Sequence, residues 1–296
     1  MAAALLTVTG LVPAGLLVLG PHVPDPSGAA SYLGTALPWS VLWLPVLVVA
    51  AFLLRSRLVI ASAVALAAAL AIVLVPAVRP TGGQGSPVLS LVSENVDAGN
   101  SDPLATIRAL AARHADVVAL EELTDGSLSA AESVLDSRYP HRAVAGTVAI
   151  WSTTPLTDLR PLDLAGMPGR GLAVTLGPAG TRVRVYVVHL ASFRLGLYRE
   201  RDDQLAQLRQ LLADDPAPRL VAVGDFNAGS TDPAFRALTG VAGEHGLPLL
   251  GLGFTWPSSH PVVRLDHVLV RGLGETTSVL PANGSDHRGV MAQLRR

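Results

Sequence analysis

The pattern of apolar and polar residues changes near residue 80. Residues 1–80 contain three apolar stretches, at about 2–20, 37–54 and 58–78. Each approaches the ~20 apolar residues that a helix needs to cross the hydrocarbon core of a bilayer. We therefore predict a membrane region of three transmembrane helices. The alternative is two spans after an irregular first segment, because Pro13 interrupts the first stretch.

Charged residues around these stretches predict the orientation. A cleaved signal peptide would need a positively charged start, which the first stretch lacks. Arg55 and Arg57 lie between the second and third stretches and are expected to stay in the cytoplasm. Three spans then bring the chain after Val78 to the outer face, although Arg79 weakly favours the opposite orientation. We predict a multi-pass protein of the cell membrane whose part after residue 80 lies outside the cytoplasm.

A flexible Gly-rich linker at 81–86 separates this region from a second domain at 87–296. In that domain, Asp102-Pro103 is a typical N-cap and first-turn pair, so a helix is expected to run to about residue 114. Strands are predicted at 88–96, 116–120, 149–151, 173–176, 183–189, 220–223, 268–270 and 289–294, and further helices at 127–135, 200–213 and after Asp232-Pro233. Some strands follow one another without a helix between them. This mixture indicates an α/β sandwich of mixed sheets with helices outside.

Composition excludes some kinds of site. The chain has no Cys, which rules out disulfides and thiolate metal sites. Its formal net charge is −1, and the first 80 residues contain one acidic and three basic residues, so the remainder carries about −3. Tight binding of duplex nucleic acid generally needs a basic surface. The charge therefore disfavours a processive DNA-binding protein, but not a nuclease of low affinity.

Polar residues gather at the ends of the predicted strands, where open α/β sheets place ligand sites. These segments are Ser93–Asn95, Glu121-Glu122, Val188-His189, Gly224–Asn227 and Arg264–His267, with Ser285–His287 in the loop before the last strand. Carboxylate and amide oxygens suit Mg²⁺, Mn²⁺ or Ca²⁺ better than zinc. Each segment alone could be an ordinary turn or a charged strand edge, and His189 could be a core histidine.

The order of these segments is more specific. From residue 86 to the C-terminus the chain resembles the endonuclease/exonuclease/phosphatase superfamily, and GDFNA with a later Asp-His is the most specific part of the match. The matching segments are LVSENV (91–96), DVVALEEL (116–123), VAIWSTTPL (148–156), VYVVHLAS (185–192), LVAVGDFNA (220–228), FTWP (254–257), RLDHVLV (264–270) and SDHRGV (285–290). The resemblance implies a four-layer α/β sandwich, with two mixed β-sheets packed face to face and helices outside. It also implies a phosphoesterase that uses Mg²⁺ or Mn²⁺.

The resemblance assigns roles to individual residues. Asn95, Glu122 and Asp286 are expected to hold the metal. His287 is expected to be the general base and Asp266 to orient it. A histidine held by a carboxylate is a suitable base, because it titrates near neutral pH.

The expected phosphate contacts include two departures from the family pattern. Asp225 and Asn227 are expected beside the scissile phosphate, and His189 could protonate the leaving group. Glu121 stands where many members have Gln. Trp151-Ser152 stands where Ser-Arg is usual, so one phosphate-binding cation is expected to be missing. The residues that could replace it are Arg170 and Arg264.

Three functions are compatible with the sequence. The first is a nuclease or general phosphodiesterase that cleaves by metal-assisted, in-line attack of water. The second, favoured by the membrane region, is a phosphodiesterase or phosphatase acting on lipid headgroups. The third, a non-enzymatic module, is disfavoured because every catalytic position is filled. The segment 193–198 (FRLGLY) is a short candidate for a loop that contacts bases or enters lipid, and no obligate protein partner is evident.

Overall fold

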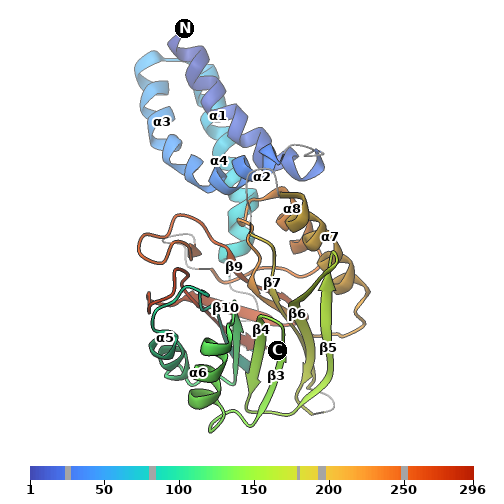
Figure 1. Cartoon of the computed structure of the whole chain (residues 1–296). Coiled ribbons are helices and arrows are strands. Elements are labelled where there is room, and N and C mark those ends of the chain that lie inside the picture. The colour runs from blue at the N-terminus through green and yellow to red at the C-terminus, as the bar shows by residue number, and fades with distance from the viewer. Residues whose placement is uncertain (24–27, 80–84, 179–180, 193–197, 248–252) are drawn as a thin grey trace.

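The chain forms a bundle of apolar helices that stands on an α/β part (Figure 1). The computed structural model describes residues 1–23, 28–79, 85–178, 181–192, 198–247 and 253–296. Most of the predicted linker at 81–86 and of the predicted contact loop at 193–198 lies outside the described residues.

The bundle contains the three predicted apolar helices. Its elements are α1 (Ala2–Leu19), η1 (Gly20–His22), α2 (Ala29–Ala36), η2 (Leu37–Leu42), α3 (Trp43–Leu54) and α4 (Arg57–Val78). Three segments among the described residues are long and apolar enough to cross a membrane: Ala2–His22, Ala29–Leu54 and Arg57–Val78. The second is longer than predicted, because α2 and η2 continue into α3. Pro13 lies within α1 without ending it.

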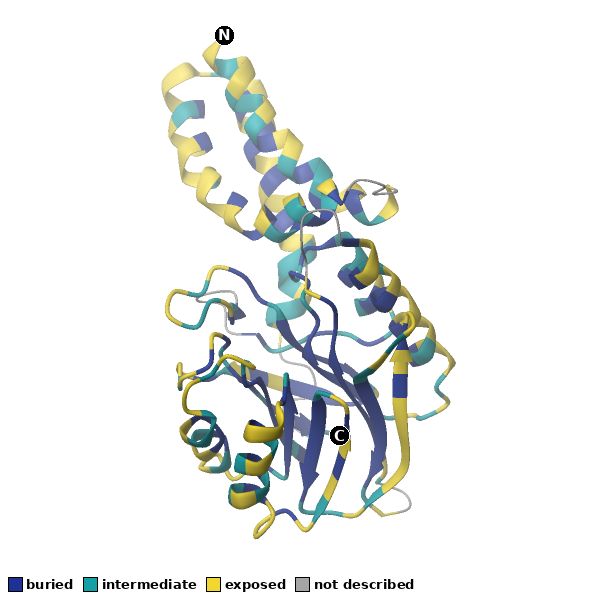
Figure 2. Cartoon of the chain, viewed as in Figure 1, coloured by how far each residue is buried: buried dark blue, intermediate teal, exposed yellow. Residues whose placement is uncertain are grey.

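The helices of the bundle pack tightly inside and expose apolar side chains outside. At Gly10 an added Cβ would lie 2.9 Å from the Cβ of Ser62, so α1 can approach α4 closely only because it has a glycine there. Large apolar residues cover the outer surface, for example Phe52 (81% exposed) and Leu58 (67%) (Figure 2). Water would penalise this surface, whereas the hydrocarbon of a bilayer would not.

The α/β part contains two mixed sheets. Its strands are β1 (Pro87–Asn95), β2 (Val117–Glu121), β3 (His141–Ala145), β4 (Val148–Ser152), β5 (Leu156–Leu164), β6 (Met167–Leu176), β7 (Val183–His189), β8 (Leu220–Asp225), β9 (Asp266–Arg271), β10 (Gly274–Val279) and β11 (Val290–Arg295). One sheet has the order β10-β11-β1-β2-β4-β3 and the other β5-β6-β7-β8-β9. The pairs β1–β2 and β7–β8 are parallel, and the other pairs are antiparallel.

The predicted four-layer arrangement is confirmed. Its helices are α5 (Pro103–Ala111), α6 (Asp125–Leu135), α7 (Tyr198–Asp214) and α8 (Pro233–Thr239). A central core of Val, Leu, Ile and Ala side chains joins the inner faces of the two sheets. The helices α5 and α6 cover the outer face of the first sheet, and α7 and α8 cover that of the second. Each fully buried Val or Leu contributes about 1.5–3 kcal/mol to stability, so the two sheets are firmly joined.

Local signals explain where the helices begin. The Asp102 carboxylate accepts a hydrogen bond from the Ala105 N–H at 3.0 Å, and the Asp232 carboxylate accepts one from the Ala234 N–H at 2.8 Å. Each aspartate thereby satisfies a backbone donor in the first turn of its helix. Both N-caps were predicted, and they confirm the start of α5 and α8.

Candidate active site

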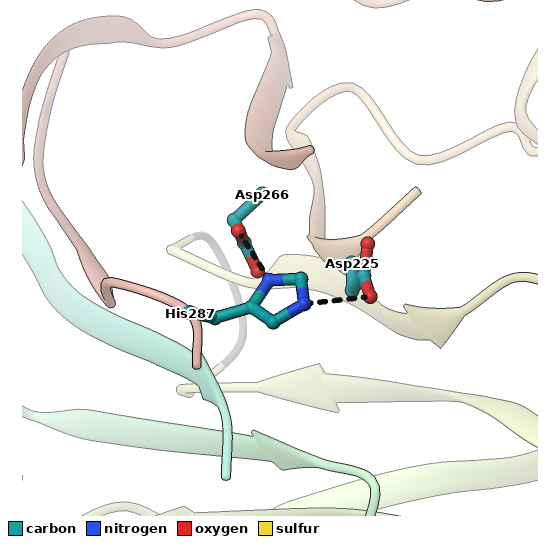
Figure 3. A group of neighbouring side chains, drawn as sticks. All are labelled: Asp225, Asp266 and His287. Atoms are coloured by element: carbon teal, nitrogen blue, oxygen red, sulfur yellow. Dashed lines mark hydrogen bonds and ion pairs between the residues drawn. The ribbon is translucent and has the colours of Figure 1, made fainter. Parts of the chain in front are cut away.

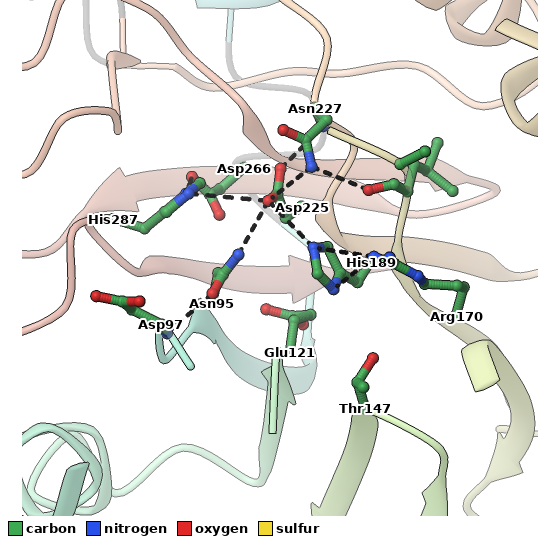
Figure 4. A network of polar contacts seen from close by, with 12 residues as sticks. Asn95, Asp97, Glu121, Thr147, Arg170, His189, Asp225, Asn227, Asp266 and His287 are labelled. Atoms are coloured by element: carbon green, nitrogen blue, oxygen red, sulfur yellow. Dashed lines mark hydrogen bonds and ion pairs between the residues drawn. The ribbon is translucent and has the colours of Figure 1, made fainter. Parts of the chain in front are cut away.

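Polar residues at the ends of five strands meet at one edge of the sandwich. In the first sheet Asn95, at the end of β1, is paired with Glu121, at the end of β2. In the second sheet Asp225, at the end of β8, is paired with His189 of β7 and with Asp266, the first residue of β9. Because both parallel pairs end at this edge, residues that are far apart in sequence share one site (Figure 4).

His287 reaches this edge from the loop before β11. The Ser285 hydroxyl fixes that loop, because it donates to the Asn95 carbonyl at 2.7 Å and accepts from the His287 N–H at 3.0 Å. The Nδ1 atom of His287 lies 2.9 Å from Oδ2 of Asp266, and its Nε2 atom lies 3.8 Å from Oδ2 of Asp225 (Figure 3). Asp266 therefore fixes the ring and its tautomer, and Nε2 faces the remaining site residues.

Asp225 has the most contacts with the other polar residues of the site. Its carboxylate accepts hydrogen bonds from the Asn95 side chain at 3.0 Å and from the backbone and side chain of Asn227 at 2.8 and 3.1 Å. His189 Nε2 lies 3.9 Å from the same carboxylate. The preceding Gly224 has a φ of 131°, and an added Cβ would lie 2.1 Å from the Val188 carbonyl, so the Gly of the GDFNA motif is required by the backbone.

The charges of the cluster depend on burial and on these contacts. Burial raises the pKa of Asp225 to about 7, although His287 opposes the rise. Burial alone would lower the pKa of His287, but Asp266 and then Asp225 raise it to about 11. Burial and the charge of Arg170 lower the pKa of His189 to about 3. His287 is thus a cation as long as no other positive charge offsets Asp266 and Asp225, whereas His189 is a neutral imidazole.

The two adjacent glutamates have different surroundings. Glu121 is fully buried and accepts a hydrogen bond from the Ser93 hydroxyl at 2.8 Å, and burial raises its pKa well above the usual range. Its Oε2 atom has no hydrogen-bond partner among the described residues. Glu122 has a φ of 59° and turns to the pocket wall, where it is half-buried. Glu122 was predicted as the metal ligand, while Glu121 lies behind it as a second carboxylate.

A pocket of about 390 Å³ opens over this network. It is lined by Asn95, Glu122, His189, Asp225, Asn227, Asp286 and His287, which are seven of the eight predicted site residues. Asp266, the eighth, is fully buried behind His287. Asp286 is half-exposed at the rim, where its Oδ2 atom accepts from the Trp256 indole at 3.2 Å.

The Trp151-Ser152 position, where a phosphate-binding cation was expected to be missing, lies away from the pocket. Ser152 pairs with Val117, the first residue of β2, and so lies at the opposite edge of the sheet from the site. An arginine at that position could not reach a phosphate in the pocket. Arg170 lies at the site instead, with Nη1 3.3 Å from Nδ1 of His189. Arg264 is buried against Glu244 at 2.8 Å and does not line this pocket.

Some residues that line the pocket were not identified from the sequence, among them Asp97, Trp256 and Thr35. Asp97 lines the pocket, and its N–H donates to the Asn95 side chain at 3.0 Å. Trp256 belongs to the FTWP segment, but no role had been given to it. Thr35 lines the same pocket from the end of α2. The spacing of Asp97 two residues after Asn95 was an available signal, whereas nothing near Thr35 in the sequence indicated catalysis.

The residues present fit a hard divalent cation. Asn95, Glu122 and Asp286, the predicted ligands, line the same pocket as Asp225, and a carboxylate oxygen of Asp225 lies within 4.8 Å of one of Asp266. Asp266 Oδ1 and Glu121 Oε2 are buried without hydrogen-bond partners among the described residues. Buried carboxylate oxygens without partners are costly unless positive charge offsets them. Oxygen atoms therefore dominate this edge, as a site for Mg²⁺ or Mn²⁺ requires.

Comparisons with known proteins agree with this geometry. The model of the Endonuclease/Exonuclease/phosphatase family matches residues 95–287, a range that contains all eight predicted site residues. None of the curated proteins matches the chain.

Several solved structures share the fold. Sphingomyelinase C from Streptomyces griseocarneus is 18% identical, with a TM-score of 0.53 over 70% of this chain and 99% of that one. A double mutant of beta toxin from Staphylococcus aureus with bound magnesium ions is 16% identical, with a TM-score of 0.55 over 70% and 99%. Truncated TDP2 from Caenorhabditis elegans is 18% identical, with a TM-score of 0.56 over 70% and 98%. At these identities the likeness concerns the fold.

Proposed function

Because the chain belongs to the endonuclease/exonuclease/phosphatase family of metal-dependent phosphoester hydrolases, we propose that it hydrolyses phosphodiester bonds beside the membrane in which residues 2–78 anchor it. One observation carries the proposal. His287, Asp266 and Asp225 form a connected buried group at the wall of a pocket, and the pocket also presents Asn95 and Asn227. Phosphoester hydrolysis needs an activated water, stabilised phosphoryl charge and a supported leaving oxygen, and this group offers donors and acceptors for each.

In the proposed reaction His287 takes a proton from the attacking water at Nε2, while Asp266 holds Nδ1. His287 can accept that proton only after losing its own, and the loss is favoured when positive charge offsets Asp225 and Asp266. The Asn227 amide nitrogen donates to the Leu190 carbonyl at 2.9 Å and to Asp225 at 3.1 Å, so in the proposed reaction it exchanges the longer bond, to Asp225, for one to a phosphoryl oxygen. The neutral His189 can donate a hydrogen bond to the leaving oxygen.

Asn95, Glu122 and Asp286 would hold the divalent cation, since all three line the pocket with oxygen atoms. When bound, Mg²⁺ or Mn²⁺ neutralises charge on the phosphoryl oxygens and favours in-line attack. The beta toxin structure with magnesium ions supports this choice of metal. Arg170 is the best-placed side chain for a second positive contact to the phosphate, because it lies beside His189.

The orientation in the membrane is part of the proposal. Met1 and the turn at Arg55–Arg57 lie at the end of the bundle far from the α/β part (Figure 1). If these arginines stay in the cytoplasm, residues 87–296 form an extracytoplasmic catalytic domain.

A substrate panel tests the proposed function. The full-length protein in mild detergent would be assayed with Mg²⁺ and with Mn²⁺ against bis-p-nitrophenyl phosphate, plasmid DNA, RNA, sphingomyelin and phosphoinositides. We expect cleavage of at least one diester and its loss in Asp266→Asn. Equal rates for the wild type and this variant on every substrate would contradict the proposal.

A further inference from the structure

The membrane helices form part of the wall of the catalytic pocket. Thr35, at the end of α2, lines the pocket together with the catalytic residues. Its position is fixed from both sides: an added Cβ on Gly229 would lie 3.2 Å from Thr35 Cα, and the Thr231 hydroxyl donates to the Gly34 carbonyl. The pocket therefore opens next to the segment that enters the bilayer.

A second cavity lies between the end of α4 and the α/β part. Its volume is about 210 Å³. Ile72, Val73 and Pro76 form its apolar side. Thr35 and Val263 line both this cavity and the catalytic pocket, so the two spaces share one wall. A ligand with one end in the cavity could reach His287 with its other end by extending over Thr35 and Val263.

The cavity lies at the depth of the membrane surface. The helix α4 has 22 residues and is about 33 Å long, so Ile72–Val78 form the last turns of a bilayer-spanning segment. Trp39, Trp43 and Trp256 are partly exposed (42, 44 and 38%) at this end of the bundle. Tryptophan is enriched at membrane–water interfaces.

Trp39 also joins the bundle to the segment 254–262 of the α/β part. The indole N–H of Trp39 donates to the Val262 carbonyl at 2.9 Å, and its ring centroid lies 5.4 Å from that of Phe254. Leu247 N–H donates to the Ala77 carbonyl at 3.0 Å on another side of the junction. These contacts fix the position of the bundle on the α/β part, and so fix the position of the cavity relative to the catalytic residues.

The opposite side of the cavity is polar. Arg236 and Arg264 both line it. Arg264 is 1% exposed, and its Nη2 atom is buried without a hydrogen-bond partner among the described residues. An unpaired buried guanidinium donor is costly, which points to an acceptor supplied by a ligand. Phospholipids carry ester or amide carbonyls at this depth, between the acyl chains and the phosphate.

We propose that this cavity binds the interfacial portion of a membrane phospholipid, with the first acyl carbons against Ile72 and Val73 and a carbonyl near Arg264. The phosphodiester of the same lipid then extends past Thr35 to His287. This inference rests on the proposed phosphodiesterase activity and specifies its substrate as a lipid of the surrounding bilayer. Nucleic acid offers no apolar chain for the cavity, and the charge of about −3 after residue 80 does not attract it.

The test fills the cavity from the lipid-exposed side. Ile72 is 63% exposed, so Ile72→Trp adds bulk at the mouth without disturbing a packed core. The matched control is Ile60→Trp, on the same helix at 50% exposure and 12 residues away, or about 18 Å. Full-length proteins would be reconstituted in nanodiscs containing sphingomyelin, phosphatidylcholine and phosphatidylglycerol, with Mg²⁺. Rates on these lipids and on bis-p-nitrophenyl phosphate would be measured side by side.

We expect Ile72→Trp to lower the ratio of lipid rate to soluble-ester rate by at least about tenfold, because displaced lipid no longer aligns its phosphate. Ile60→Trp should leave the ratio within about twofold, since its side chain faces lipid away from the cavity. Native mass spectrometry supplies a second readout: phospholipid should remain bound to the wild type and the control, and be lost from Ile72→Trp.

The remaining outcomes separate this inference from the proposed function. An unchanged ratio in Ile72→Trp with lipid still bound would overturn the cavity as a lipid site. Cleavage of the soluble ester or of DNA by the wild type, without cleavage of any lipid, would overturn the inference and leave the phosphodiesterase standing. Cleavage of no diester at all would overturn both.

Discussion

Replacing His287 by Ala is the sharpest test of the catalytic group. The change removes the imidazole whose Nε2 atom faces the pocket and leaves Asp266 without its partner at 2.9 Å. Asp225 is the adjacent group with a pKa near neutrality, about 7, but its oxygens already accept from Asn95 and Asn227. It is therefore a poor substitute base. General-base catalysis accounts for about 10²–10⁴-fold in rate, so we expect a loss of that size, or about 2.7–5.4 kcal/mol of activation free energy.

Two related variants divide the effect between proton transfer and hydrogen bonding. His189→Ala should cost about tenfold or less on bis-p-nitrophenyl phosphate, because a neutral His189 supplies only a hydrogen bond and a nitrophenolate leaves without a proton. Asp266→Asn should approach the effect of His287→Ala. It also removes the negative charge that raises the pKa of His287, so the pH–rate profile should shift to lower pH.

The assay compares rates of the purified full-length variants on nitrophenyl and unactivated diesters, with thermal melts as the folding measure. His141→Ala is the matched control, because His141 pairs with Ser152 at the edge of the sheet opposite the site. Its rate should equal that of the wild type. A correctly folded His287→Ala variant that keeps a near wild-type rate on both esters would refute the proposed mechanism and weaken the role given to Asp266.

Further predictions concern the metal, the orientation and a buried carboxyl. Excess EDTA should abolish activity, and Mg²⁺ or Mn²⁺ should restore it; full activity in EDTA would remove the metal from the mechanism. A C-terminal alkaline phosphatase fusion should be active, because Arg55 and Arg57 hold their loop in the cytoplasm; an inactive fusion beside an active cytoplasmic reporter would reverse the orientation. Burial raises the pKa of Glu275 well above its usual range, so folding is favoured below the unfolded-state value and loses stability as the pH rises toward the folded-state value. Glu275→Gln should therefore flatten the decline in melting temperature between about pH 5 and 8, and an unchanged slope would contradict this.

The strands that the sequence predicted best are those whose residues are all buried. The strands β2, β4, β7 and β8 are buried at every residue, and their apolar runs were recognised in the sequence. The strand β5 was missed, because it lies at a sheet edge and most of its residues are exposed. Edge strands need little apolar surface, so their sequences resemble loops.

The different positions of Glu121 and Glu122 could not be predicted from their motif. The sequence presents two adjacent glutamates, and only the backbone conformation separates their roles: Glu121 ends β2 inside the sandwich, whereas Glu122, at φ 59°, faces the pocket. The distance of the Trp151-Ser152 position from the site was hidden from the sequence for a related reason. Because β4 pairs with β2 in the antiparallel direction, its last residues lie at the end of the sheet away from the site. The direction of this pairing is set by the tertiary structure.

By itself, the sequence determined the three apolar helices and the mixed α/β sandwich, because apolar runs and caps are local signals, and its short motifs gave the eight candidate site residues through their resemblance to a family. Only the tertiary structure brought Asn95, Asp225, Asp266 and His287 to one sheet edge, through strand order and register. It also decided that Thr35, 60 residues before Asn95 in the chain, lines the same pocket. No local pattern in the sequence predicts such a contact, since it depends on how the bundle of apolar helices packs against the sandwich.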